Sequence, residues 1–195
     1  AKLFAALDQT RLHDLALKEV EKIYTQRTQQ SASFFENNAD VLNHQSELIC
    51  PPEVYIPYAV EIATQHISRK EIAPKDFSTL LEIGPGDCYL LTALAPLFDK
   101  ALGIDTSRSM FEAGLKTLEL TSAENITLQN KDFYGLPGET KVDVMVAAMV
   151  LHHMPSPNAF FQQVAKILKQ DGLLILVELC PHTQEKAKTL CGDLW

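Results

Sequence analysis

The sequence has few cysteines, and they are widely separated. Four occur in 195 residues: Cys50, Cys88, Cys180 and Cys191. No Cys-x-x-Cys pair and no Cys/His cluster with the spacing of a zinc site is present, so the sequence predicts neither a metal centre nor a disulfide framework. We expect free thiols in a reducing compartment, and therefore a cytoplasmic protein.

Long apolar runs and basic clusters are also absent. No stretch approaches the roughly 18 apolar residues that a membrane-spanning helix needs, and no basic segment followed by an apolar core marks a signal peptide. The chain has 17 Lys and Arg residues against 25 Asp and Glu residues, which gives a formal net charge of -8. We therefore expect no membrane association and no direct binding of nucleic acid by this chain.

The chain does have enough apolar sequence, 46% of its residues, for one sizeable core. Apolar positions at helical spacing within residues 2–30 predict an amphipathic helix. A polar stretch follows, and a second helical pattern begins after Pro51 and Pro52. We interpret residues 1–76 as an N-terminal helical linker and lid region.

From Ser78 onward, short apolar runs alternate with helix-length segments, which is typical of βα units and a parallel sheet. The predicted strands are 79–83, 101–104, 126–128, 142–148 and 173–179, and the predicted helices are 89–98, 109–120 and 157–169. The strands are almost continuously apolar, as expected where helices cover both faces. The pattern predicts an α/β fold: a three-layer αβα sandwich over residues 77–195, with a mostly parallel sheet of at least five strands.

A glycine loop follows the first predicted strand, in Leu80-Leu81-Glu82-Ile83-Gly84-Pro85-Gly86-Asp87-Cys88. Glycine lets the main chain approach a ligand closely, and the helix that follows offers free N–H groups. A tight turn without a ligand is the alternative. Tyr89 stands where a dinucleotide fingerprint needs Gly or Ala, and the Glu82 carboxylate would repel a pyrophosphate, so both disfavour NAD.

A second acid, Asp105, ends the next apolar run, 21 positions after Gly84. A carboxylate at this place can accept hydrogen bonds from both hydroxyls of a ribose. Alternatively, Asp105 caps the next helix, although Thr106 or Ser107 could do so instead.

These ordered motifs, between about Thr79 and Glu178, resemble those of the class I S-adenosylmethionine-dependent methyltransferases, particularly the small-molecule branch, whose fold is Rossmann-like. The first motif is similar to Glu82-Ile83-Gly84-Pro85-Gly86, the adenine-binding stretch to Lys131-Asp132-Phe133, and the fourth-strand motif to residues 142–154. The resemblance implies S-adenosylmethionine as the cofactor. The residues that it implies are Glu82 for the methionyl amino group, Gly84 and Gly86 for the methionyl part, Asp105 with Thr106 for the ribose, Asp132 and Phe133 for the adenine, and Ala148 and Met149 near the sulfonium.

The chain departs from the family at Cys88, where the family often has glycine. This departure predicts a loop slightly farther from the cofactor, or weaker binding.

Two histidines, His152 and His153, follow the fourth predicted strand, at the sheet edge where parallel α/β folds place their ligands. An imidazole there could act as a general base or orient a substrate. The alternative is that both histidines only shape the turn. We take His153 as the candidate catalytic residue.

The aromatic pair Phe34 and Phe35 lies in a segment, residues 32–40, that resembles the lid preceding many such domains; the alternative is ordinary core packing. The long helix before it resembles the linker of arsenical-repressor-type regulators, in which a winged-helix DNA-binding domain precedes a methyltransferase. No winged helix is apparent in this sequence. Family members usually continue into two further strands beyond the fifth, which we expect to be missing here. An uncovered sheet edge favours association, so a homodimer is a further hypothesis.

The leading hypothesis is an enzyme that transfers a methyl group from S-adenosylmethionine to an unidentified small molecule. The alternative is a non-catalytic domain that binds the same cofactor and acts as the sensor of a transcriptional regulator, because both functions need the same cofactor residues. An NAD-dependent oxidoreductase is a third possibility, and Tyr89 opposes it.

Overall fold

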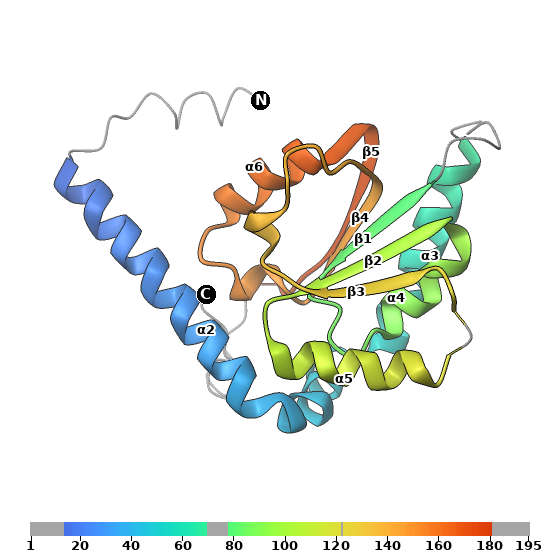
Figure 1. The fold of residues 1–195 in the computed structure, drawn as a ribbon, viewed down its shortest axis with the longest axis horizontal. Helices are drawn as coiled ribbons and strands as arrows, with labels where there is room; N and C mark the ends of the chain where they lie inside the picture. The colour runs from blue at the N-terminus through green and yellow to red at the C-terminus, as the bar shows by residue number, and fades with distance from the viewer. Residues whose placement is uncertain (1–13, 70–77, 122, 181–195) are drawn as a thin grey trace.

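A single parallel sheet organises the structure, a computed structural model that describes residues 14–69, 78–121 and 123–180 (Figure 1). Its strands are β1 (Thr79–Ile83), β2 (Lys100–Asp105), β3 (Ile126–Asn130), β4 (Val142–Ala148) and β5 (Leu168–Val177). They are ordered β3-β2-β1-β4-β5, and every pair is parallel. Consecutive strands run outward from β1 to β3, and the chain then returns to place β4 on the other side of β1. The predicted Rossmann-like α/β sandwich with at least five strands is confirmed.

Helices cover both faces of the sheet. One face carries α3 (Pro52–Arg69), α4 (Tyr89–Leu94) and α5 (Arg108–Glu119), and the other carries α6 (Pro157–Ile167) (Figure 1). The core is divided in the same way, since Leu80 and Val144 belong to one buried cluster and Leu81 and Met145 to the other. Neighbouring residues of one strand therefore enter opposite cores, which explains why these strands are apolar at nearly every position.

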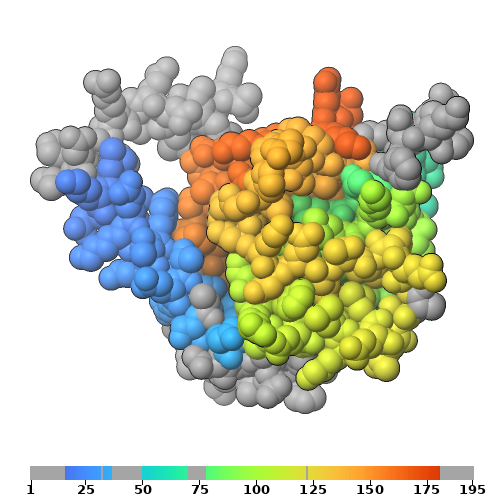
Figure 2. Space-filling view, in the orientation of Figure 1, coloured from blue at the N-terminus to red at the C-terminus, as the bar shows by residue number. Residues whose placement is uncertain are grey.

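The N-terminal helix is longer than the sequence suggested. Helix α2 spans Asp14–Ile49, and residues 1–13 lie outside the described part of the chain. The polar stretch expected after residue 30 continues the helix, because residues 14–49 contain no Gly or Pro to end it. Helix α2 contacts α5 and lies along one flank of the molecule in the space-filling view (Figure 2). The predicted domain boundary between residues 76 and 77 falls within residues 70–77, which are not described.

The junction between α6 and β5 also differs from the prediction. The helix ends at Ile167, and strand pairing begins at once between Leu168 and Val142. The pairing is irregular before it resumes between Leu173 and Val144, and Asp171 takes a left-handed conformation with φ of 59° in this interval.

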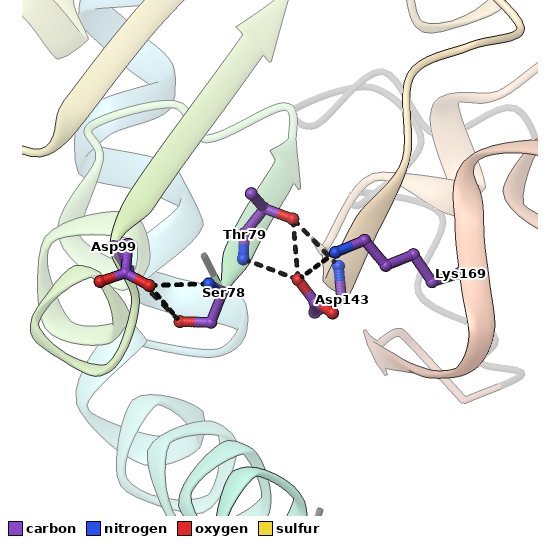
Figure 3. A network of polar contacts seen from close by, with 5 residues as sticks. All are labelled: Ser78, Thr79, Asp99, Asp143 and Lys169. Atoms are coloured by element: carbon purple, nitrogen blue, oxygen red, sulfur yellow. Dashed lines mark hydrogen bonds and ion pairs between the residues drawn. The ribbon is translucent and has the colours of Figure 1, made fainter. Parts of the chain in front are cut away.

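A polar network joins the strands at the amino-terminal end of the sheet (Figure 3). Asp143 Oδ2 accepts hydrogen bonds from the Thr79 backbone N (2.9 Å), the Thr79 hydroxyl (3.0 Å) and Lys169 Nζ (2.9 Å). Burial favours the neutral acid, but the bonds from Lys169 and Thr79 outweigh it and lower the pKa of Asp143. A second carboxylate, Asp99, accepts from the Ser78 backbone N at 2.8 Å. These contacts hold the start of β1 against its neighbours.

Candidate functional site

The carboxyl ends of the strands surround a cavity of about 450 Å³ at the opposite end of the sheet from that network. All ten residues that the sequence nominated line it: Glu82, Gly84, Gly86, Asp105, Thr106, Asp132, Phe133, Ala148, Met149 and His153. Its volume lies within the range of roughly 300–1,000 Å³ that small-molecule sites occupy. The individual roles of these residues stay predictions.

The glycine loop takes backbone conformations that favour glycine. Gly84 has φ of +62° and Gly86 has φ of +52°. A Cβ atom on Gly84 would lie 2.8 Å from Val150 Cγ2, which is too close. The Gly84 N–H donates to the Ile104 carbonyl at 2.9 Å, so the loop is fastened to the end of β2. The main chain of the loop therefore lines the cavity, as a ligand-binding loop requires.

Cys88, the departure from the family pattern, is accommodated inside the protein. It has a left-handed φ of 63° and is fully buried. A Cβ atom added to Gly114 of α5 would lie 2.7 Å from Cys88 Sγ and 2.9 Å from the Gly86 carbonyl oxygen. Gly114 thus leaves the space that the cysteine occupies. Burial raises the pKa of the Cys88 thiol to about 12, so it stays neutral.

Glu82 is the most unusual charged residue of the site. It is only 2% exposed, and its Oε2 atom has no hydrogen-bond partner. Burial raises the pKa of this carboxyl from 4.5 to about 8. A buried acceptor without a partner is costly, and it marks a place where a donor from a ligand would be stabilised.

Asp105 lies across the glycine loop from Glu82 at the end of β2. Its carboxylate accepts hydrogen bonds from the Ser107 backbone N at 2.8 Å and from the Gly86 N–H. Burial outweighs these two bonds and raises the pKa of Asp105 to about 6. The cap of α5 is Ser107, whose side chain accepts from the Met110 N–H at 3.3 Å. The alternative role considered for Asp105, capping this helix, is therefore wrong.

The stretch after β3 forms one turn of 3-10 helix, Phe133–Gly135. Asp132 caps it, because its Oδ1 atom accepts from the Tyr134 N–H at 3.0 Å. Phe133 is buried beneath the cavity, and its carbonyl accepts from Gln163 of α6.

The turn after β4 is held from β5. Met149 has a left-handed φ of 56°, and its N–H donates to the Val177 carbonyl at 2.8 Å. His152 Nδ1 is hydrogen-bonded to Glu178 Oε1, and the His152 backbone N donates to the other oxygen of the same carboxylate at 3.2 Å. Burial alone would raise the pKa of Glu178, but the bonds from His152 and Leu179 outweigh it and lower this pKa. The Glu178 carboxylate thus orients His152 beside His153.

The aromatic lid segment lies within α2, and Phe35 lines the cavity. Its ring meets the His153 ring edge-on, with the ring centroids 4.7 Å apart. The Phe35 carbonyl also accepts from the Ser109 hydroxyl of α5 at 3.2 Å. Phe35 therefore packs onto the domain and forms part of the cavity wall, while its role as a lid stays a prediction.

Several lining residues were missed by sequence reasoning. Tyr55 of α3, Met110 of α5 and Tyr134 line the cavity. Glu178 is hydrogen-bonded to His152, which also lines it. The only signal in the sequence was the position of Tyr134 directly after the adenine-binding stretch.

Among the described residues, no group of three or more His, Cys, Asp or Glu side chains could hold a metal ion, and no helix is both long and apolar enough to span a membrane.

Comparison with known proteins agrees with this geometry. A family described as "Methyltransferase domain" matches residues 81–174. The curated "Uncharacterized methyltransferase YcgJ" of Bacillus subtilis (strain 168) is 27% identical over 100 residues, which are 51% of this chain and 40% of that protein. The match thus spans less than half the length of this relative.

Solved structures show the same fold. The crystal structure of YcgJ superposes with a TM-score of 0.52 at 22% identity, covering 63% of this chain and 53% of that one. A DhpI–SAM–HEP complex gives a TM-score of 0.56 at 18% identity, covering 85% and 71%. The plantazolicin methyltransferase BpumL, in complex with a triazolic desmethylPZN analog and SAH, gives 0.62 at 15% identity, covering 89% and 65%.

The strand order, the glycine loop and the family match lead to one assignment. Residues 81–174 match a methyltransferase domain, and the chain has the fold of S-adenosylmethionine-dependent methyltransferases.

Proposed function

We propose that the chain transfers a methyl group from S-adenosylmethionine to a small-molecule acceptor. The observation that carries the proposal is the buried Oε2 atom of Glu82, which has no partner and lies on the same cavity as the glycine loop and Asp105. An unpaired acid at this place suits a cationic ligand group, because an ammonium would supply the missing donors and the opposite charge.

The charge of the cavity supports the same ligand. Its described lining includes the carboxyl groups of Glu82, Asp87, Asp105 and Asp132. Lys131 is the one Lys or Arg residue in that lining. A ligand with a sulfonium and an ammonium group fits such a lining better than one with phosphates. The structures of DhpI and BpumL, which share the fold, were solved with SAM or SAH.

The residues divide into those that would hold the nucleoside and those that would face the transferred group. Asp105 would accept from the ribose hydroxyls, and Asp132 with the Phe133 N–H would meet the adenine. The cofactor, when bound, supplies an electrophilic methyl group. Ala148 and Met149 would border that group, and His153 would orient the acceptor. Alignment and exclusion of water can provide much of the catalysis of an in-line displacement.

Calorimetry tests the cofactor assignment. We expect micromolar binding of S-adenosylmethionine and S-adenosylhomocysteine to the wild type, and no binding of NAD. Asp105→Asn should weaken binding of both by about 1–3 kcal/mol, as expected for removing a charged hydrogen-bond acceptor. The matched control is Asp171→Asn, an exposed position outside the cavity. Binding of NAD, or equal affinities for Asp105→Asn and the control, would contradict the assignment.

A methyl-transfer assay distinguishes the enzyme hypothesis from the non-catalytic sensor hypothesis. We expect radiolabelled methyl groups to pass from S-adenosylmethionine to small molecules in an extract, in the presence of this chain. Cofactor binding without any transfer would favour the non-catalytic sensor, which otherwise stays a hypothesis.

A further inference from the structure

Part of the cavity wall has no role in holding the cofactor as proposed above. It is an aromatic and thioether wall made of Phe35, Tyr134, His153 and Met154, all of which line the cavity. Phe35 contacts His153 edge-on at 4.7 Å between ring centroids, and Met154 follows His153 in sequence. The Tyr134 hydroxyl lies 3.9 Å from Met154 Sδ and donates to it. The four side chains therefore form one continuous surface from three separate segments of the chain.

This wall offers mainly apolar surface and contains no Asp, Glu, Lys or Arg. Burial is the main cause that raises the pKa of Tyr134 to about 12, so its hydroxyl remains neutral. Aromatic rings and a thioether sulfur favour the edges and faces of another ring. The wall has no Lys or Arg to pair with an anionic group of a ligand, and burying such a charge without a partner is costly.

The rest of the cavity disfavours an anion in particular. Three aspartates, Asp87, Asp105 and Asp132, line it, and Lys131, the one Lys or Arg of the described lining, is exposed beside Asp132. A carboxylate or phosphate on the acceptor would therefore meet like charges rather than a cationic partner.

We propose that the wall formed by Phe35, Tyr134, His153 and Met154 is the acceptor subsite, and that it takes a planar aromatic molecule without an anionic group. The proposal rests on the proposed function, because it assumes that the nucleoside half of the cavity holds the cofactor. It narrows the acceptor from any small molecule to one chemical class.

A matched set of probes tests the class. The full chain is saturated with S-adenosylhomocysteine and titrated with 2-naphthalenemethanol, 2-naphthylmethylammonium and 2-naphthoate, with binding followed by saturation-transfer NMR. These probes share one ring system and differ in charge. We expect the neutral alcohol and the ammonium each to bind at least tenfold more tightly than the carboxylate. Binding of the carboxylate that equals or exceeds that of the alcohol would overturn the proposal.

Variants locate the subsite. Phe35→Leu and Met154→Ala should each weaken the neutral probe at least fivefold and leave the affinity for S-adenosylhomocysteine within twofold. The matched control is Phe161→Leu, a partly exposed aromatic of α6 that does not line the cavity. Unchanged probe affinity in both variants, or a loss of S-adenosylhomocysteine affinity, would overturn the assignment of this wall.

The two proposals fail differently. If the wild type does not bind S-adenosylhomocysteine, the proposed function is refuted, and the acceptor subsite with it. If S-adenosylhomocysteine binds and the neutral probe has no advantage over the carboxylate, only the acceptor subsite is refuted.

Discussion

Glu82→Gln should make the ligand-free protein more stable at neutral pH. The wild-type carboxyl is buried and its Oε2 atom has no partner, so ionising it inside the protein is unfavourable. Glutamine keeps nearly the same shape and cannot ionise. The substitution therefore removes a cost that the wild type accepts at its cavity, as proteins often do at functional sites.

The magnitude follows from the pKa of Glu82, which rises from 4.5 to about 8 on folding. Between these two pH values the unfolded chain has released a proton that the folded chain retains, so stability falls as pH rises through this window. Each pH unit corresponds to about 1.4 kcal/mol, which gives about 3 kcal/mol at pH 7 and about 5 kcal/mol above pH 8. Glu82→Gln should recover most of this loss. It should gain little near pH 4.5, where Glu82 is protonated in the folded protein and about half protonated in the unfolded chain.

Urea unfolding of the wild type and Glu82→Gln at pH 5, 6, 7 and 8 measures the difference directly. Glu139→Gln serves as the control, since Glu139 is exposed and the substitution changes the net charge equally. The advantage of Glu82→Gln over the wild type should grow with pH, while that of the control should stay constant. Parallel stability curves for the wild type and Glu82→Gln would refute the argument that this carboxyl is neutral in the folded protein.

Two further substitutions test the packing behind the loop and the network at the other end of the sheet. Gly114→Ala should destabilise the protein by about 1–3 kcal/mol in thermal unfolding, because the new Cβ would lie too close to Cys88 Sγ and the Gly86 carbonyl oxygen. The control is Gly135→Ala, which should have little effect because the space around its Cβ is open. Asp143→Ala should lower the free energy of unfolding in urea by about 1–3 kcal/mol, because it removes the acceptor of the Thr79 N–H and hydroxyl. Lys169→Ala should lower it by less than about 1 kcal/mol, because the lysine is partly solvated. Equal losses for Asp143→Ala and Lys169→Ala would mean that the ion pair, and not the bonds to Thr79, dominates the network.

The sheet was the most predictable part of the fold. The bounds of β1 and β4 coincide with the predicted runs 79–83 and 142–148, because these strands are buried on both faces and end at polar or glycine-containing turns. The length of α2 was not predictable from apolar spacing, since its second half is a polar helix that nothing in the sequence interrupts. The end of α6 was misplaced by two residues because Leu168 and Lys169 have side chains that suit a helix, and strand pairing with β4 overrides this preference.

The site could be predicted to the extent that its residues follow strands. Gly84, Asp105, Asp132 and Met149 each lie at or just after the end of a strand, and parallel strands bring these ends to one edge of the sheet. Tyr55 could not be found in this way, because it projects from a helix without a motif. The pairing of His152 with Glu178 was also hidden, since the two residues are 26 positions apart and meet only through the register of β4 and β5.

The buried acid connects stability with ligand binding. Below pH 8 the folded, ligand-free protein holds Glu82 mainly as the neutral acid, whereas an ammonium group is best stabilised by the carboxylate. If Glu82 holds the ammonium group of the cofactor, as proposed, binding releases a proton from Glu82, and the affinity for the amino end of the cofactor should rise with pH while the stability of the empty protein falls. The same substitution that stabilises the empty protein, Glu82→Gln, would then remove the anion with which the ligand pairs. The two acids thus contrast: hydrogen bonds lower the pKa of Asp143 and contribute to folding, whereas burial raises the pKa of Glu82, whose Oε2 atom has no partner in the ligand-free protein.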